Sequence, residues 1–201
     1  MFLTPSELKP QLTDERIDTV GRLIATAHNQ VLERADERDT GWSIGCRSHV
    51  WRSTAIIQAV EARNYPWLKI ESPGLRFVFS IGGVPVSMYR GSREHPKKNI
   101  LNRAESFPEL QQLPLLDELD AQPELVWSFA LETAPNGEVL KVEFIGITPA
   151  GETLAYRHVP LEEPVTRRYK IEPGQAELID LPPARVSLIQ DKPARKRANK
   201  K

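Results

Sequence analysis

The sequence predicts an α+β fold in which an antiparallel sheet of about five strands packs on two N-terminal helices. Three observations predict it. Apolar residues recur at three- and four-residue spacing in the first third of the chain. The spacing changes to two after residue 75, and the tight-turn pairs Gly82-Gly83 and Asn136-Gly137 each join two alternating segments.

A first helix is predicted over residues 14–38. Thr13 suits the N-cap, because its hydroxyl can accept from a free backbone N–H of the first turn, and Gly41 suits the position just past the helix end. One apolar stripe is formed by Ile17, Val20, Ile24, Ala27, Val31 and Ala35.

A second helix is predicted over about residues 47–63, and Pro66 prevents its continuation. Its core-facing residues are expected to be Val50, Ile57 and Val60, with Trp51 and Thr54 beside them.

The segment LRFVFSIGGVPVSMYR predicts a hairpin that turns at Gly82-Gly83. Pairing from this turn sets Ile81 opposite Val84 and Phe79 opposite Val86, so that the apolar residues of both strands share one face. A short strand over residues 67–71 is expected to precede the hairpin.

The segment WSFALETAPNGEVLKVEFIG predicts a second hairpin, because Asn136-Gly137 suits a tight turn. Its register pairs Glu132 with Lys141 and Phe129 with Phe144.

A third strand follows the turn at Gly151 and is expected to set Tyr156 opposite Phe144 and Arg157 opposite Glu143. Glu132, Lys141, Glu143 and Arg157 would then form a charged ladder on the exposed face of the sheet. This order of elements loosely resembles profilin-like, roadblock-like and GAF-type sensor folds, which implies a sheet with helices on one face and no particular function.

The chain is expected to form a single domain over residues 1–159. Prolines are dense in residues 160–191, which predicts an extended arm that packs on the domain or on a partner. Residues 192–201 are expected to be a disordered basic tail.

The composition limits the location and the class of the protein. Its single cysteine, Cys46, cannot form an intrachain disulfide, and its N-terminal segment lacks the pattern of a signal peptide. No stretch reaches the roughly 20 apolar residues of a membrane span. We therefore expect a cytoplasmic protein that makes no membrane contact.

Charge is distributed unevenly along the chain. The whole sequence has 27 cations and 27 acids, but residues 192–201 hold six cations and no acid. Residues 1–191 therefore hold 21 cations against 27 acids, a formal charge of −6. The six cations of the tail are Lys192, Arg195, Lys196, Arg197, Lys200 and Lys201. A tail of this composition suits a polyanion or an acidic partner.

The stretch YRGSREHPKKN, residues 89–99, is a second candidate contact with phosphates. Its cations Arg90, Arg93, Lys97 and Lys98, with Arg103 beyond them, would line a phosphate-binding loop. The alternative is a solvated connection after a hairpin, in which Glu94 neutralises part of the charge.

Two residue sets leave an enzyme open as an alternative. Glu132, Lys141 and Glu143 match the residue types of a metal-dependent nuclease, but not its spacing. Arg90 and His95 match the arginine and histidine spacing of a ribonuclease motif found in all-helical HEPN domains, although Gly91 and Pro96 disfavour a helix here.

Cys46 and His49 lie three residues apart, so on a helix they would share a face. A thiolate beside an imidazole is a possible nucleophile or half of a metal site, but the further ligands of a metal site are missing. The sequence therefore predicts no metal and no cofactor.

The function expected from these observations is that of a non-enzymatic binding or accessory protein. Its acidic body would contact a protein partner or a second copy of the chain. Its basic tail, with the loop at residues 90–103, would contact nucleic acid or another polyanion without reading its sequence. The alternatives are a nuclease and a ligand-sensing or dimerising module.

Overall fold

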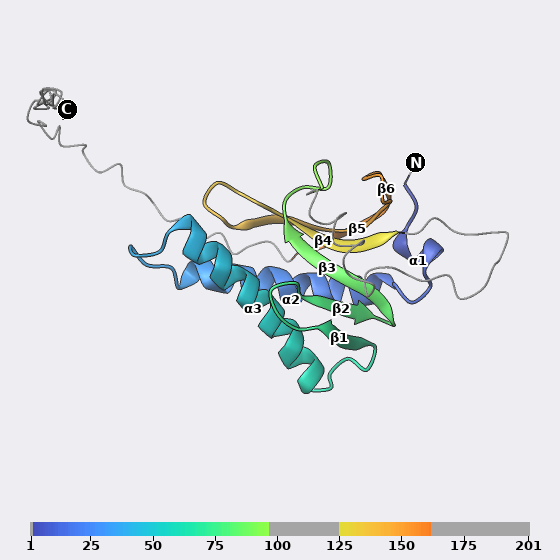
Figure 1. Ribbon diagram of the computed structural model, residues 1–201, viewed down its shortest axis with the longest axis horizontal. Helices are drawn as coiled ribbons and strands as arrows, with labels where there is room; N and C mark the ends of the chain where they lie inside the picture. Colours follow the sequence, from blue (N-terminus) through green and yellow to red (C-terminus); the bar gives the residue numbers. More distant parts are fainter. Residues whose placement is uncertain (1, 97–124, 162–201) are drawn as a thin grey trace, which may run out of the picture. The chain divides into compact units, whose positions relative to one another are not determined.

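The computed structural model describes residues 2–96 and 125–161, and within these ranges it contains three helices followed by six strands (Figure 1). The helices are α1 (Pro5–Leu8), α2 (Asp14–Glu33) and α3 (Gly41–Glu61). The strands are β1 (Leu68–Ser72), β2 (Val78–Ile81), β3 (Val84–Arg90), β4 (Val126–Thr133), β5 (Val139–Ile147) and β6 (Thr153–Val159). The proline-rich arm from residue 162 onward and the basic tail lie outside the described residues, as do residues 97–124.

The six strands form one sheet in which sequence neighbours are also neighbours in space. All neighbouring pairs are antiparallel except β3 and β4, which run parallel. The expectation of a purely antiparallel sheet was therefore wrong, while the α+β class is confirmed. A tight turn can only join antiparallel strands, whereas residues 91–125 are long enough to carry the chain back to the start of a parallel strand.

Helix α2 follows the prediction at its start and ends earlier than expected. The Thr13 hydroxyl accepts from the N–H of Arg16, and the predicted stripe from Ile17 to Val31 is buried. The helix ends at Glu33, however, and Ala35 is exposed. The Asp36 carboxylate accepts from the N–H of Arg38 at 2.8 Å, a local bond that competes with helix continuation.

Helix α3 begins six residues before the predicted start, and its predicted core face is confirmed only in part: Ile57 and Val60 pack against the core, but Val50 does not. Gly41, expected to follow the end of α2, is instead the first residue of α3 after the N-cap Thr40. Val50, predicted to face the core, is 54% exposed. The buried face consists of Ser48, Arg52, Ser53, Ile56 and Ala59, so its first half is polar.

Both predicted hairpins form with the expected registers. Ile81 pairs with Val84 across Gly82-Gly83, and both glycines have positive φ (61° and 85°), which glycine adopts without strain. In the second hairpin Glu132 pairs with Lys141 and Phe129 with Phe144.

The register of β6 was predicted one residue wrong. Its turn closes as expected, with Thr148 and Glu152 paired around Gly151, but an irregularity follows between Gly146 and Ile147. Glu143 therefore faces His158, and Tyr156 faces Ile145. Because a shift of one residue reverses every side chain, Arg157 points to the helices instead of joining the charged ladder.

Helices α2 and α3 pack on one face of the sheet, α2 mainly against β5 and β6 and α3 against β1 (Figure 1). The core between these layers is built around four aromatic side chains, each at most 1% exposed: Phe79, Trp127, Phe129 and Phe144. The opposite face of the sheet holds a smaller buried cluster of Tyr89, Val126, Ala130, Ile145 and Ile147.

Candidate anion-binding site

The predicted loop begins where β3 ends. Arg90 is the last residue of that strand and is exposed. The next residue, Gly91, donates its N–H to the Leu131 carbonyl at 2.8 Å, which holds the chain beside β4. The Tyr89 hydroxyl then donates to the Ser92 carbonyl at 3.0 Å. These bonds keep the first residues of the loop on the sheet.

Arg93 folds back on the sheet instead of extending into solvent. Its guanidinium lies 4.2 Å from the ring centroid of Tyr156 and 5.2 Å from that of Phe2. It also lies 3.9 Å from the Glu143 carboxylate, and its side chain is only 20% exposed. Arg93 therefore has internal partners that compete with any external phosphate.

Of the residues predicted to contact nucleic acid, the structure describes Arg90 and Arg93. Lys97, Lys98, Arg103 and all six cations of the tail lie outside the described residues. His95, the other half of the proposed ribonuclease spacing, is exposed.

The predicted charged ladder forms only in part: Glu132, Lys141 and Glu143 lie together, but Arg157 is absent from it and Glu143 is buried. The Lys141 amine lies 2.9 Å from the Glu132 carboxylate and 3.6 Å from the Glu143 carboxylate. Within residues 2–96 and 125–161, no group of three or more histidine, cysteine, aspartate or glutamate residues is arranged to hold a metal ion. Lys141 therefore already pairs with both carboxylates that the nuclease reading would assign to a metal.

A buried polar group that the sequence did not predict is formed by residues of α2 and α3, and within it the charge of Arg52 acts on His28. It consists of His28 from α2 with Ser48 and Arg52 from α3, which are 1%, 2% and 5% exposed. The Arg52 Nε donates to the Ser48 carbonyl at 2.9 Å, so the arginine side chain is held along its own helix. The His28 Nε2 lies 2.9 Å from the Gly137 carbonyl, an acceptor, and therefore carries the proton.

Each member of this group keeps one buried polar atom without a hydrogen-bond partner. These atoms are Nδ1 of His28, the hydroxyl of Ser48 and Nη1 of Arg52. No carboxylate pairs with Arg52 in the part of the chain that the structure describes. Buried arginines are usually paired, because an uncompensated charge is costly away from water.

The charges within the group act on one another. Burial lowers the pKa of Arg52 to about 10, and the nearby charge of Arg90 adds to this effect. Burial also lowers the pKa of His28, against the effect of its bond to Gly137, and the charges of Arg52 and Arg90 lower it further. His28 is therefore neutral at pH 7, and the arginines of this region attract anions.

The sequence contains a signal for this group that periodicity analysis misses. Ser48, Arg52, Ile56 and Ala59 recur at helical spacing, but the first two are polar and so do not count toward an apolar stripe. His28 likewise follows Ile24 by four residues and precedes Val31 by three. A polar residue on an otherwise apolar helical stripe is therefore the sequence pattern that indicates a buried polar group.

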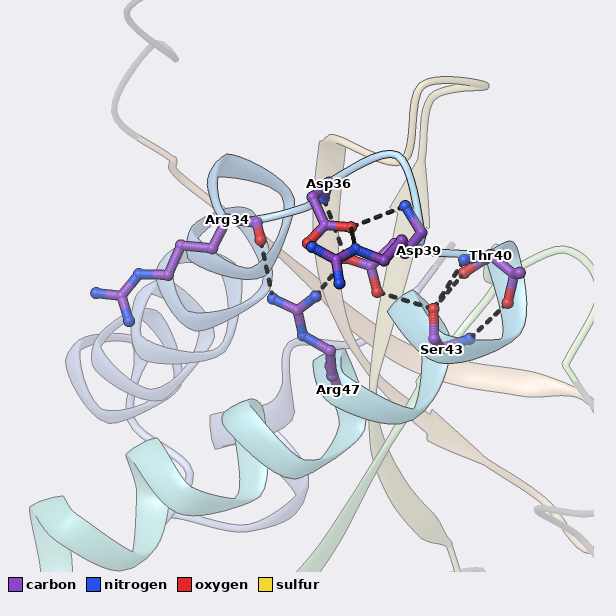
Figure 2. A network of polar contacts seen from close by, with 7 residues as sticks. Arg34, Asp36, Asp39, Thr40, Ser43 and Arg47 are labelled. Carbon is purple, nitrogen blue, oxygen red and sulfur yellow. Dashed lines mark hydrogen bonds and ion pairs between the residues drawn. The ribbon is translucent and has the colours of Figure 1, made fainter.

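The connection between α2 and α3 fixes the two helices that carry the group (Figure 2). Arg47 of α3 forms an ion pair with Asp39 and donates to the Arg34 carbonyl at 3.2 Å. Ser43 donates its hydroxyl to Asp39 at 2.9 Å. Hydrogen bonds from Arg47, then from Ser43 and from the backbone of Asp36, lower the pKa of Asp39.

Cys46 is exposed on α3, and His49 is half-buried one turn later.

Among the described residues, no helix has the length and apolar character needed to cross a membrane. Comparisons of the chain with protein-family models, with curated proteins and with solved structures found no match.

Proposed function

We propose that this protein is a non-enzymatic binding or accessory protein that contacts nucleic acid or another polyanion through its basic tail. The observation that supports this proposal is the separation of charge along the chain, with +6 in residues 192–201 and −6 in residues 1–191. Six cations without apolar anchors attract a phosphate backbone and read no sequence.

Arg90 would add a contact from the folded body. It is the exposed last residue of β3, and its charge lowers the pKa of both Arg52 and His28. A region with several cations, one of them exposed, favours the approach of an anionic chain. Arg93 is not part of this proposed contact, because its guanidinium already lies against Tyr156 and Glu143.

Contact with a protein partner is the second half of the proposal, and the exposed face of α3 supports it. Trp42 is 79% exposed and Val50 is 54% exposed. Cys46, also exposed, lies between them at the same four-residue spacing. A large aromatic side chain on such a face is a typical anchor in protein interfaces.

The test is fluorescence anisotropy with labelled DNA and RNA over a salt series, for the full chain and for residues 1–191. If all six tail cations meet phosphates, the logarithm of affinity falls with the logarithm of salt at a slope of about −5. This slope is expected to collapse in the truncated chain. Equal binding by both chains, or no binding near 50 mM salt, would overturn the proposed role of the tail.

A further inference from the structure

We propose that His28, Ser48 and Arg52 form a binding site for a phosphate group, either free phosphate or a small molecule that carries one. This site is separate from the proposed polyanion contact. Its residues are at most 5% exposed, so the sugar-phosphate backbone of a nucleic acid cannot reach them as it reaches a flexible tail.

The first argument is the missing counter-charge. Arg52 is buried, and the structure describes no carboxylate beside it. The charge of Arg90, another cation, lowers the pKa of Arg52 further. Because removing one partner from a buried ion pair is strongly destabilising, a buried arginine without a partner is unusual in a folded protein. A bound anion would supply the partner.

The second argument is the orientation of the donors. Ser48 and Arg52 lie one helical turn apart on the same face of α3, and the Nε bond to the Ser48 carbonyl fixes the guanidinium. Nη1 of Arg52 and the hydroxyl of Ser48 have no partner. Two such donors held on one helix face suit two oxygens of one oxyanion.

The third argument selects phosphate among the oxyanions. His28 donates from Nε2 to the Gly137 carbonyl, so Nδ1 of the neutral ring is an acceptor, and it has no partner. An acceptor in an anion site disfavours sulfate, which carries no proton at neutral pH. Hydrogen phosphate can accept from Arg52 and Ser48 and donate its own proton to His28.

The test measures thermal unfolding of the full chain in increasing inorganic phosphate at constant ionic strength, with sulfate in a parallel series. Specific binding raises the melting temperature along a curve that follows ligand saturation. At a phosphate concentration about a hundredfold above Kd, the expected rise is about 5–10 °C. Sulfate is expected to give only the gradual, non-saturating increase that it gives most proteins.

Three variants make the test specific. Arg52→Met preserves the buried volume and is expected to fold but to lose the saturating response to phosphate. Ser48→Ala removes one proposed donor and is expected to raise the apparent Kd about tenfold. The control is Arg38→Met, because the Arg38 side chain is 94% exposed, and it should keep the full response.

The outcomes separate this site from the proposed function. A saturating response that persists in residues 1–191 and disappears in Arg52→Met supports the site, whatever the tail does with nucleic acid. Equal responses to phosphate and sulfate, or equal responses of the wild type and Arg52→Met, would overturn it. If short oligonucleotides give the same saturating shift as phosphate and Arg52→Met abolishes both, the phosphate group comes from nucleic acid and the separation from the polyanion contact is wrong.

Discussion

Arg157 of β6 binds Asp18 of α2 through two parallel hydrogen bonds, from Nε to Oδ1 at 2.9 Å and from Nη2 to Oδ2 at 2.7 Å. A further contact joins Nη1 to the Asp14 carboxylate at 2.7 Å. The Asp18 side chain is only 13% exposed, so the pair is partly shielded from water. This contact ties the edge strand of the described sheet to the first turns of α2.

Replacing Arg157 by lysine should therefore destabilise the fold although the charge is kept. Lysine cannot present two donors in a fixed plane, so one of the parallel bonds is lost. We expect the free energy of unfolding to fall by about 1–2 kcal/mol in urea denaturation. Arg38→Lys, at an exposed site, should change it by less than about 0.5 kcal/mol. A double-mutant cycle with Asp18→Asn that shows no coupling would contradict the assignment.

Arg157 was placed on the wrong face of the sheet because the predicted register of β6 was wrong by one residue. The turn at Gly151 was predicted correctly, and the pairing of Ile147 with Thr153 follows it. Between Ile147 and Gly146 the register then shifts, because β6 has one extra residue there. The residues of the turn do not predict such a bulge. A bulge is set by packing, and here the shift gives Arg157 a partner on α2.

Gly21 of α2 allows the close approach of β6. A Cβ added at this position would lie 2.7 Å from Cγ2 of Val159, which is fully buried. Gly21→Ala should destabilise the protein by about 1–3 kcal/mol, because the core has no room for the added methyl group. Urea denaturation measures the change.

Two matched variants test this explanation. In Gly45→Ala, on α3, the added Cβ meets nothing within 4 Å, so only helix propensity changes and stability should rise by up to about 1 kcal/mol. Combining Gly21→Ala with Val159→Ala should cost less than the sum of the two single changes. Strict additivity would show that the two side chains do not compete for the same space.

The face of α3 shows a second limit of sequence reasoning. Counting apolar residues selected Val50 as core-facing, yet the core side of that turn is occupied by Ser48 and Arg52. The packing of α3 against α2 outweighed the apolar pattern in this turn of the helix. The candidate site lies in the same turn. The parallel pairing of β3 with β4 was missed for a different reason, since alternation within a strand does not reveal the direction of its neighbour.

His28 should make stability depend on pH in the mildly acidic range. Burial, followed by its bond to Gly137 and the charges of Arg52 and Arg90, sets its pKa, and the net effect lowers that pKa below 6.5. As pH falls below 6.5 the unfolded chain therefore takes up a proton before the folded one does, and stability is lost. Above this value the contribution of His28 is constant.

The measurement compares the free energy of unfolding near pH 7.5 and pH 5.5 for the wild type and His28→Gln. The wild type should lose roughly 1 kcal/mol more than the variant over this interval. Glutamine does not titrate and can still donate to the Gly137 carbonyl. An equal loss in both proteins would show that other groups cause the pH dependence.

Arg90 and Arg93 were both predicted to contact phosphates. Their environments in the structure predict different effects of replacing them. If Arg90 contacts phosphate as proposed, Arg90→Ala should reduce the steepness of the salt dependence of nucleic-acid binding by about one unit. Arg93→Ala should leave the slope unchanged and lower the free energy of unfolding by about 1–2 kcal/mol, because Tyr156, Phe2 and Glu143 lose their common partner. Arg38→Ala serves as the control for both readouts. A reduced slope in Arg93→Ala with unchanged stability would mean that Arg93 leaves the sheet to bind the polyanion, and that its contact with Glu143 contributes little to the fold.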